Sequence, residues 1–210
     1  GVIDGQKVKA DKEAVQKFCA ELSSYGDIYV NDAFGTAHRA HASMVGVKLP
    51  IRAAGFLMEK ELTSFASVIE NPQRPVLAIL GGAKVADKIQ LINNLIDKVD
   101  LLIICGGMSY TFLKHLGKPI GKSLFDAEGA KIVPDLLEKA KAKGVELYFP
   151  EDYLVVNNIS PDEAGEVVEV IPDDKMSVDN GPKTVEIFTK AINSAKTVIM
   201  NGPAGVFEID

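Results

Sequence analysis

The spacing of hydrophobic and polar residues predicts strands and helices that alternate along most of the chain. Short apolar runs such as 76–80 are typical of strands buried on both faces of a parallel sheet. Longer segments with an apolar stripe at helical spacing lie between them. We therefore predict strands at 27–32, 76–80, 101–105, 145–149 and 197–201, and helices at 12–24 (capped by Asp11), 58–70, 85–98, 108–116, 127–143 and 182–194.

Two segments depart from this alternation. Residues 33–55 are rich in Gly, Ala and His with weak periodicity, and we expect a functional loop with a short helix there. Residues 150–175 are expected to form irregular or antiparallel structure. Elsewhere, strands that alternate with helices imply right-handed crossovers and a doubly wound parallel α/β sheet. In such sheets ligands bind beyond the carboxyl ends of the strands.

Composition and charge narrow the possible partners. The chain has 210 residues, of which 47% are hydrophobic and 25% charged, the balance of a globular protein. No apolar run approaches the roughly 20 residues of a membrane span. A net charge of −6 argues against a nucleic-acid surface. We therefore predict neither a membrane nor a nucleic acid as partner.

The two cysteines indicate a reducing, cytoplasmic setting. Cys19 and Cys105 have no metal-ligand spacing and no further cysteines for a disulfide framework. Because Cys105 ends an apolar run, we expect it to be a small core residue rather than a nucleophile.

Glycine-bearing turns follow three of the predicted strands. Without side chains, such turns let a flat or polyanionic ligand approach the bare backbone. Tight turns after strands are common in α/β proteins, but several at the same sheet edge, with lysines at one of them, predict a nucleotide site. The turns are Gly81-Gly82-Ala83-Lys84, Gly106-Gly107 and Asn201-Gly202-Pro203-Ala204-Gly205.

Lys84 and Lys88 lie four residues apart at the start of the predicted helix 85–98. Cations there face the positive end of the helix dipole, and their mutual repulsion costs roughly 0.2–0.5 kcal/mol. A phosphate group at the glycine turn would reverse both effects. The alternative is that both lysines are solvated surface residues, with Asp87 offsetting part of the repulsion. Neither Gly-x-x-x-x-Gly-Lys-Ser/Thr nor Gly-x-Gly-x-x-Gly occurs at the strand ends, which argues against other nucleotide-binding modules.

Long motifs in the chain resemble phosphoglycerate kinase. The resemblance extends over essentially all 210 residues but only over the middle of such an enzyme, so we expect a portion of a longer protein. It implies that 1–52 is the C-terminal part of the phosphoglycerate-binding domain, the end of a second α/β domain. It further implies an interdomain linker helix at 53–72 and an incomplete Rossmann-like nucleotide-binding domain at 73–210. The motifs are 31–41, 55–62, 81–88 and 201–208.

The resemblance implies an activity and its cofactor. Phosphoglycerate kinase transfers a phosphoryl group reversibly between 1,3-bisphosphoglycerate and Mg-ADP, giving 3-phosphoglycerate and Mg-ATP in glycolysis. We therefore expect small-molecule substrates, Mg²⁺ bound to the nucleotide, a cytoplasmic location and a monomer. The family's metal-binding aspartate belongs to a later segment outside this chain, so no metal ligand is predicted here. The alternative is a folded, non-catalytic fragment that cannot turn over alone.

The resemblance also implies roles for charged residues. Arg39 resembles an arginine that holds the phosphoglycerate, since a guanidinium binds phosphate or carboxylate bidentately. Its alternative is a surface salt bridge. His38 and His41 are expected to pack or orient, because this transfer needs little proton chemistry. Lys84 resembles the lysine that meets the transferring phosphoryl group, and Lys88 the one that reaches the nucleotide phosphates. Lys84 and Arg39 are thus the predicted catalytic residues.

The remaining roles concern the base and the ribose. Glu208 resembles the carboxylate that accepts hydrogen bonds from the ribose hydroxyls, the alternative being a solvated acid at a strand end. Ser177 stands where many relatives have a smaller residue, often Gly. The complete predicted nucleotide-binding set is Gly82, Ala83, Lys84, Lys88, Gly106, Gly107, Ser177, Asn201, Gly202, Pro203, Ala204, Val206 and Glu208.

Overall fold

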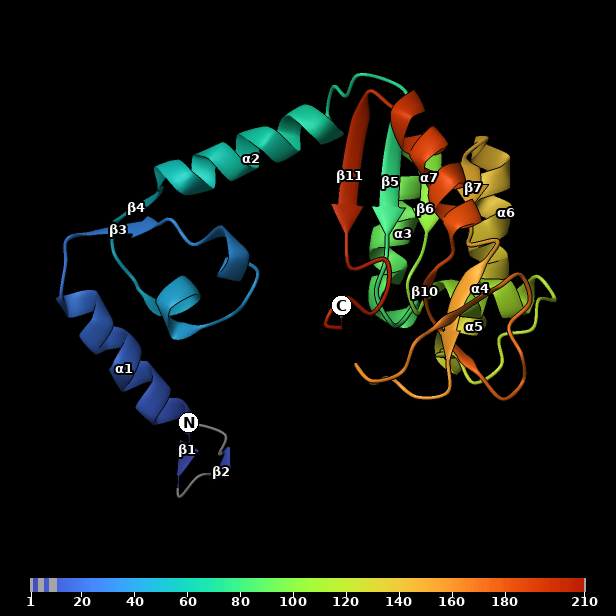
Figure 1. Ribbon diagram of the computed structural model, residues 1–210. Helices are drawn as coiled ribbons and strands as arrows, with labels where there is room; N and C mark the ends of the chain where they lie inside the picture. The colour runs from blue at the N-terminus through green and yellow to red at the C-terminus, as the bar shows by residue number, and fades with distance from the viewer. Residues whose placement is uncertain (1, 4–5, 8–10, 210) are drawn as a thin grey trace. The chain divides into compact units, whose positions relative to one another are not determined.

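The computed structural model describes residues 2–3, 6–7 and 11–209, with side chains from residue 11 onwards. The chain divides into two compact units, 1–70 and 71–210 (Figure 1). Within the described residues, no helix is both long and apolar enough to cross a membrane.

The first unit contains one pair of parallel strands and two main helices. Helix α1 (Lys12–Ser24) is capped as predicted, because Asp11 Oδ2 accepts a hydrogen bond of 3.1 Å from the Ala14 N–H. Strand β3 (Ile28–Asn31) pairs with β4 (Ile51–Ala54). Helix α2 (Phe56–Ile69) follows. The shorter elements are β1 (Val2–Ile3), β2 (Gln6–Lys7), a 3₁₀ turn (Phe34–Thr36) and a π-helical turn (Ala42–Gly46).

Strand β4 corrects the prediction of a loop with one short helix over 33–55. Its sequence, Ile-Arg-Ala-Ala, does not alternate between apolar and polar residues, and all four residues are exposed. Residues 51–54 therefore lack the period of two that indicates a strand. The pairing with β3, rather than the local pattern, determines the extended conformation.

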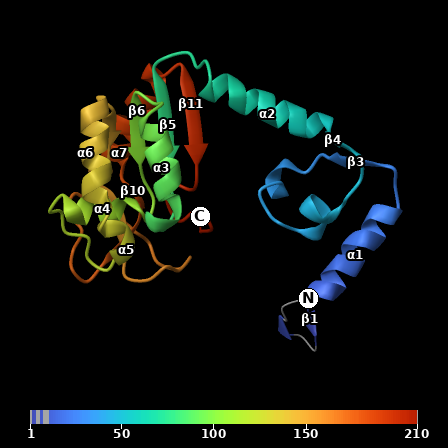
Figure 2. The ribbon, with the colours of Figure 1, turned by 180° about the vertical axis from the view of Figure 1, so that it is seen from behind.

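The second unit is built on a four-stranded parallel sheet in the order β11-β5-β6-β7. The chain proceeds outward from β5 to β7 and then returns to place β11 on the other side of β5 (Figures 1 and 2). The strand order therefore reverses at β5. The strands are β5 (Val76–Leu80), β6 (Leu101–Ile104), β7 (Glu146–Tyr148) and β11 (Thr197–Asn201).

Helices cover both faces of this sheet. Ala78 and Leu80 belong to a core shared with α3 (Ile89–Ile96), α4 (Ser109–His115) and α6 (Val133–Lys143). Leu77 and Ile103 instead pack with Phe188 of α7 (Pro182–Ser194). Because side chains of a strand alternate between faces, burial on both sides explains the continuous apolar runs. The predicted doubly wound α/β architecture is confirmed.

A smaller antiparallel sheet completes the second unit. Its order is β10-β8-β9, formed by β8 (Tyr153–Val156), β9 (Glu166–Val168) and β10 (Met176–Asn180). The first two strands fall in the segment predicted to be irregular or antiparallel. Strand β10 was not predicted.

Two predicted helices are each interrupted. The helix expected over 127–143 is divided into α5 (Ala127–Ala130) and α6, and Pro134 lies in the first turn of α6, where a missing N–H costs no intrahelical hydrogen bond. In place of a helix from residue 85, a 3₁₀ turn (Ala86–Lys88) precedes α3. The prediction that Lys84 and Lys88 share the first turns of one helix was therefore wrong.

Candidate functional site

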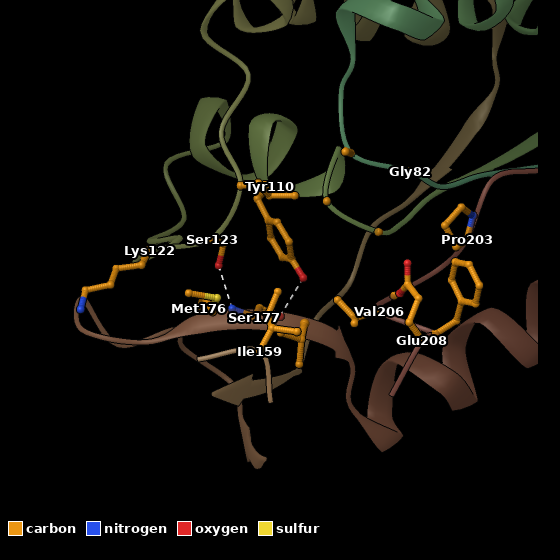
Figure 3. A pocket seen from close by; sticks show the side chains of 17 residues that line it. Gly82, Tyr110, Lys122, Ser123, Ile159, Met176, Ser177, Pro203, Val206 and Glu208 are labelled. Atoms are coloured by element: carbon orange, nitrogen blue, oxygen red, sulfur yellow. Dashed lines mark hydrogen bonds between the residues drawn. The ribbon is translucent and has the colours of Figure 1, made fainter. Parts of the chain in front are cut away.

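A pocket of about 360 Å³ opens beyond the carboxyl ends of β5, β6 and β11 in the second unit (Figure 3). This is where the strand order reverses, the expected ligand position in a doubly wound sheet. Its volume lies within the range of small-molecule sites. The lining residues are Gly82, Ala83, Gly106, Gly107, Tyr110, Lys122, Ser123, Leu124, Ile159, Met176, Ser177, Val178, Pro203, Gly205, Val206, Phe207 and Glu208.

The glycine turns are joined to one another by backbone hydrogen bonds. The Gly82 N–H donates to the carbonyl of Pro203 at 3.0 Å, and the Met108 N–H donates to the carbonyl of Gly82 at 2.7 Å. Gly106 has a φ of +63°, and a Cβ at this residue would lie 2.7 Å from the Pro203 oxygen. A glycine is therefore required at residue 106 for the three strand ends to approach one another. The absence of a side chain there also leaves part of the pocket wall as bare backbone.

A polar group forms another part of the wall. The Tyr110 hydroxyl donates to Ser177 Oγ at 2.8 Å, and the Ser177 N–H donates to Ser123 Oγ at 2.9 Å (Figure 3). Burial raises the pKa of Tyr110 to about 12, so its hydroxyl remains a protonated donor. Ser177, the departure noted in the sequence, is thus tied to α4 and to the segment that precedes α5.

Apolar side chains supply much of the remaining lining. Leu124 and Ile159 are 59% and 56% exposed and come from two separate loops. Val206 and Glu208 follow β11, and Glu208 is exposed. Lys122 extends away from the other labelled side chains (Figure 3). The cavity therefore combines bare backbone and apolar groups with few charged ones.

Eight of the predicted nucleotide-binding residues line the pocket. They are Gly82, Ala83, Gly106, Gly107, Ser177, Pro203, Val206 and Glu208. The other five, Lys84, Lys88, Asn201, Gly202 and Ala204, do not line it. Ala204 packs against the core shared by β5, β6 and α7. Asn201 and Gly202 connect the end of β11 to Pro203.

Lys84 is exposed beside an anchored segment of the chain. Asp126 accepts hydrogen bonds from the N–H groups of Ala86 at 2.8 Å and Gly129 at 3.0 Å. These two bonds lower the pKa of Asp126 below its ordinary value, and the charge of Lys84 acts in the same direction. Asp126 therefore holds the turn that carries Lys84 while the ammonium group itself stays in solvent.

Lys88 turns toward the strand ends. Its Nζ donates to the carbonyl of Gly81 at 2.7 Å and to Asn201 Oδ1 at 2.6 Å. It also lies 3.2 Å from the carbonyl of Asn201. Burial lowers the pKa of Lys88, with an opposing effect from Cys105. The backbone at Lys88 lies outside the α-helical region, with φ −118° and ψ 5°, and α3 begins at the next residue.

The predicted phosphoglycerate residue belongs to the first unit. Arg39 lies in an exposed turn, where its N–H donates to the carbonyl of Thr36 at 3.0 Å. His38 and His41 are also exposed. Over residues 11–209, the guanidinium of Arg39 makes neither a hydrogen bond nor an ion pair. The alternative of a surface salt bridge thus finds no support among these residues.

The possible metal ligands and the thiol of Cys105 can also be examined in the structure. In the described part of the chain, no group of three or more His, Cys, Asp or Glu side chains is placed to hold a metal ion. Cys105 is fully buried, and burial raises the pKa of its thiol to about 11. It is therefore the core residue that was predicted.

Nine of the lining residues are absent from the predicted nucleotide-binding set. Tyr110, Lys122, Ser123 and Leu124 lie between the predicted helices or within one, with no local signal that directs them to the pocket. Met176 and Val178 belong to the unpredicted strand β10, and Ile159 follows β8. Gly205 and Phe207 could have been included, because they lie within the glycine-rich motif 201–208.

Comparison with known proteins gives consistent matches. The family model described as phosphoglycerate kinase matches residues 5–210. Phosphoglycerate kinase of Candida albicans is 60% identical over 99% of this chain and 51% of that protein, and the Saccharomyces cerevisiae enzyme is 59% identical over the same shares. The solved structure of phosphoglycerate kinase from Coxiella burnetii matches with a TM-score of 0.83 and 40% identity, covering 96% of this chain and 53% of that one.

Fold and pocket together define the class, a doubly wound α/β protein with a candidate ligand pocket at the reversal of its strand order. Within this class, the chain belongs to the phosphoglycerate kinase family. It spans about half the length of the curated relatives it matches.

Proposed function

We propose that the chain is the part of a phosphoglycerate kinase that binds the nucleotide and contributes to phosphoryl transfer. The reaction is the reversible transfer between 1,3-bisphosphoglycerate and Mg-ADP that gives 3-phosphoglycerate and Mg-ATP in glycolysis. The observation that carries the proposal is the pocket between the three glycine turns, in a chain of this family.

The shape and chemistry of the pocket support adenine binding. Backbone at Gly106 and Gly107 leaves room for a flat ring, and apolar groups such as Leu124 and Val206 offer surfaces for its faces. Burying a base between such groups removes apolar area from water. At the exposed edge, the Glu208 carboxylate is suited to accept hydrogen bonds from the ribose hydroxyls.

Charged groups outside the pocket are assigned to the transferred phosphoryl group. In the forward reaction, the bond between the acyl oxygen and phosphorus breaks while a β-phosphate oxygen of ADP bonds to phosphorus. The electron pair of the broken bond stays on the carboxylate oxygen, and no proton needs to move. The exposed ammonium of Lys84 is suited to neutralise charge on the phosphoryl oxygens in the transition state. Lys88 at the nucleotide phosphates remains a prediction from the family resemblance.

The first unit is assigned to the other substrate. We assign residues 1–52 to the phosphoglycerate-binding domain, 53–72 to the interdomain helix and 73–210 to the nucleotide domain. Arg39, whose guanidinium is free among the described residues, is suited to bind the phosphate or carboxylate of phosphoglycerate bidentately. A cytoplasmic monomer is the form we propose.

Magnesium enters this proposal only as part of the nucleotide complex. Mg²⁺ prefers oxygen ligands and is commonly bound through one or two carboxylates together with substrate phosphates. Among the described residues, no three His, Cys, Asp or Glu side chains are grouped so that they could hold a metal ion. We therefore derive no step from a metal ligand of this chain and expect the family's aspartate, outside it, to supply that contact.

The experiment is an ADP titration followed by amide NMR, paired with a coupled kinase assay. Binding in the pocket should shift the amide signals of Gly82, Gly106 and Gly107, whereas glycines remote from it, such as Gly144, should stay unchanged. No shift at any pocket glycine would contradict the proposal. We expect the chain to bind ADP but to turn over 3-phosphoglycerate and Mg-ATP at a negligible rate. That result would correspond to the alternative of a folded, non-catalytic fragment. Turnover of roughly 1–100 s⁻¹ would show that the chain is a complete catalyst.

A further inference from the structure

Ser177 places a hydroxyl group in the wall of the pocket, although only 7% of the residue is exposed. Its backbone N–H donates to Ser123 Oγ at 2.9 Å, and its Oγ accepts from the Tyr110 hydroxyl at 2.8 Å (Figure 3). Ser123 and Tyr110 are themselves buried. The position of the Ser177 oxygen is therefore fixed from two directions by side chains of the same pocket wall.

A β-bulge brings Ser177 and the residue after it to the same cavity. In a regular strand, adjacent side chains point to opposite faces of the sheet. The pairing of β10 with β8 shifts between Ser177 and Asp179, and both Ser177 and Val178 line the pocket. Bulges of this kind re-aim side chains and are common next to active sites. The local irregularity of β10 thus adds a hydroxyl group to an otherwise apolar part of the wall.

Among residues 11–209, the proton of the Ser177 hydroxyl has only a distant acceptor. A serine hydroxyl donates one hydrogen bond and accepts two. The Tyr110 hydroxyl donates to Ser177 Oγ and has no other acceptor in this range, so the Ser177 proton points elsewhere. The Asp179 carbonyl lies at 3.4 Å, well beyond the about 2.7–2.8 Å that is usual for an O–H···O bond. Because buried polar groups normally have partners, this donor is suited to a ligand.

The ligand group that fits this donor is a ring nitrogen of the base. The phosphoryl group is assigned to Lys84, which does not line the pocket, and the ribose hydroxyls to Glu208 at its exposed edge. Ring nitrogens of a purine accept hydrogen bonds in the plane of the ring, so such a bond leaves both faces of the base free to pack. Of the acceptor nitrogens of adenine, N3 lies beside the ribose. The nitrogens left for Ser177 are N1 and N7.

We propose that the Ser177 hydroxyl donates a hydrogen bond to N1 or N7 of the purine base, and that Tyr110 is a positioning residue that directs this donor. The role rests on the proposed nucleotide site. It makes the pocket selective for bases that carry an unprotonated ring nitrogen at that edge. A wall residue that only filled space would contribute equally to a base with this nitrogen and to one with C–H in its place.

The test measures the affinity of the 210-residue chain for ADP and for its 1-deaza, 3-deaza and 7-deaza analogues by isothermal titration calorimetry. Each analogue replaces one ring nitrogen by C–H and so removes one acceptor. We expect either the 1-deaza or the 7-deaza analogue to bind about five- to tenfold more weakly than ADP. The 3-deaza analogue is the control and should bind like ADP.

Removal of the Ser177 hydroxyl should abolish this difference. Ser177→Ala should bind ADP and the affected analogue equally, both about as weakly as the unsubstituted chain binds that analogue. Tyr110→Phe should make the difference smaller, because the Ser177 hydroxyl loses the contact that sets its direction. Tyr148→Phe is the matched control, at a tyrosine of β7 outside the pocket whose hydroxyl contacts Glu146, and should keep the full difference.

The buried Tyr110 hydroxyl loses its acceptor in Ser177→Ala, so the fold of each variant is verified by circular dichroism and the thermal midpoint. If Ser177→Ala does not fold, the double variant Tyr110→Phe/Ser177→Ala replaces it. This double variant removes both hydroxyl groups together and leaves neither of them buried without a partner.

Three results would overturn the proposal. Equal affinity of the unsubstituted chain for ADP and for the 1-deaza and 7-deaza analogues would show that Ser177 donates to neither nitrogen, while the nucleotide site itself would stand. A difference that persists in the Ser177 variant would assign the contact to another group. Failure of the unsubstituted chain to bind ADP would overturn the nucleotide site, and the role of Ser177 with it.

Discussion

Lys84 keeps its charge in solvent while the turn that carries it is fixed at both ends. Asp126 holds the Ala86 N–H on one side, and the Gly82 N–H bonds to Pro203 on the other. A fixed turn with an exposed charged tip suits a group that is proposed to meet an anion during reaction, because little backbone ordering is required then.

At this residue scale we predict that Lys84→Ala in a full-length phosphoglycerate kinase carrying this sequence lowers kcat by about 100-fold or more. ADP affinity should fall by less than about tenfold, since the ammonium acts mainly on charge that develops in the transition state. Steady-state kinetics together with ADP titration measures both. Lys190→Ala, at an exposed lysine of α7 that pairs with Glu186, is the control and should change neither value. An unchanged kcat in Lys84→Ala would return Lys84 to the surface-charge alternative.

At the scale of the elements, the same capping device recurs in both units. Helix α2 begins after Gly55, and the Met58 N–H donates to Asp32 Oδ1 at 2.9 Å. Helix α7 begins after Gly181, and Asp152 accepts from the N–H groups of Lys183 and Thr184 at 2.9 and 2.7 Å. In each case a carboxylate remote in sequence supplies the cap that a glycine cannot.

Asp152 makes the stability of the second unit dependent on pH. Burial alone would raise the pKa of Asp152, but hydrogen bonds from the Thr184 hydroxyl and from the backbone N–H groups of Thr184 and Lys183 outweigh it, so its pKa lies below the ordinary 3.8. A carboxyl group with a lowered pKa stabilises the fold above its unfolded pKa, and this contribution is lost as the pH falls through the folded value. The stabilising contribution of Asp152 is therefore lost below about pH 4.

We predict that Asp152→Asn lowers the free energy of unfolding at pH 7 by about 1–3 kcal/mol. The substitution should also reduce the loss of stability between neutral pH and about pH 2, because the carboxyl group whose protonation destabilises the folded state is no longer present. Urea unfolding at several pH values measures both effects. Asp135→Asn, at an exposed aspartate in the first turn of α6, is the matched control. If the stability of Asp152→Asn depended on pH as strongly as that of the unsubstituted chain, Asp152 would not be a source of this pH dependence.

At the scale of the whole molecule, the two units differ in how much they bury. The second unit contains three hydrophobic clusters, which include the fully buried Leu77, Leu102 and Ile103. In the first unit, among residues 11–70, Val47 and Met58 are the only buried hydrophobic residues. Since burial of apolar surface is the main favourable contribution to folding, most of the stability of this chain resides in the second unit.

Hydrogen exchange should reveal this difference. We expect amides of β5 and β6 to exchange at least about 100-fold more slowly than amides of β3 and β4, because opening the buried sheet requires unfolding of the second unit. Mass spectrometry of proteolytic peptides after exchange at neutral pH would measure the two regions together. Equal protection of β3 and β5 would show that the first unit is as stable as the second.

Much of the architecture and of the pocket could be predicted from local sequence, but several features could not. Strand β4 has no alternating pattern, and β10 joins its sheet through a bulge between Ser177 and Asp179. The direction of the Lys88 side chain could not be predicted either, because its partners belong to the turn after β5 and to the end of β11. The wall residues from β10 and from the loop after β8 carry no local signal, since their place depends on how the antiparallel sheet packs.

The sequence by itself determined the strands of the main sheet, the glycine turns at their ends and the family. These depend on the apolar periodicity of short segments, on the steric freedom of glycine and on long ordered motifs. The tertiary structure decided which side chains share the pocket, the contact between Tyr110 and Ser177, and the separation of Lys84 in solvent from Lys88 at the strand ends. The physical reason is that these contacts join residues 67 and 113 positions apart, as in Tyr110–Ser177 and Lys88–Asn201, where only packing of the complete sheet sets the distance.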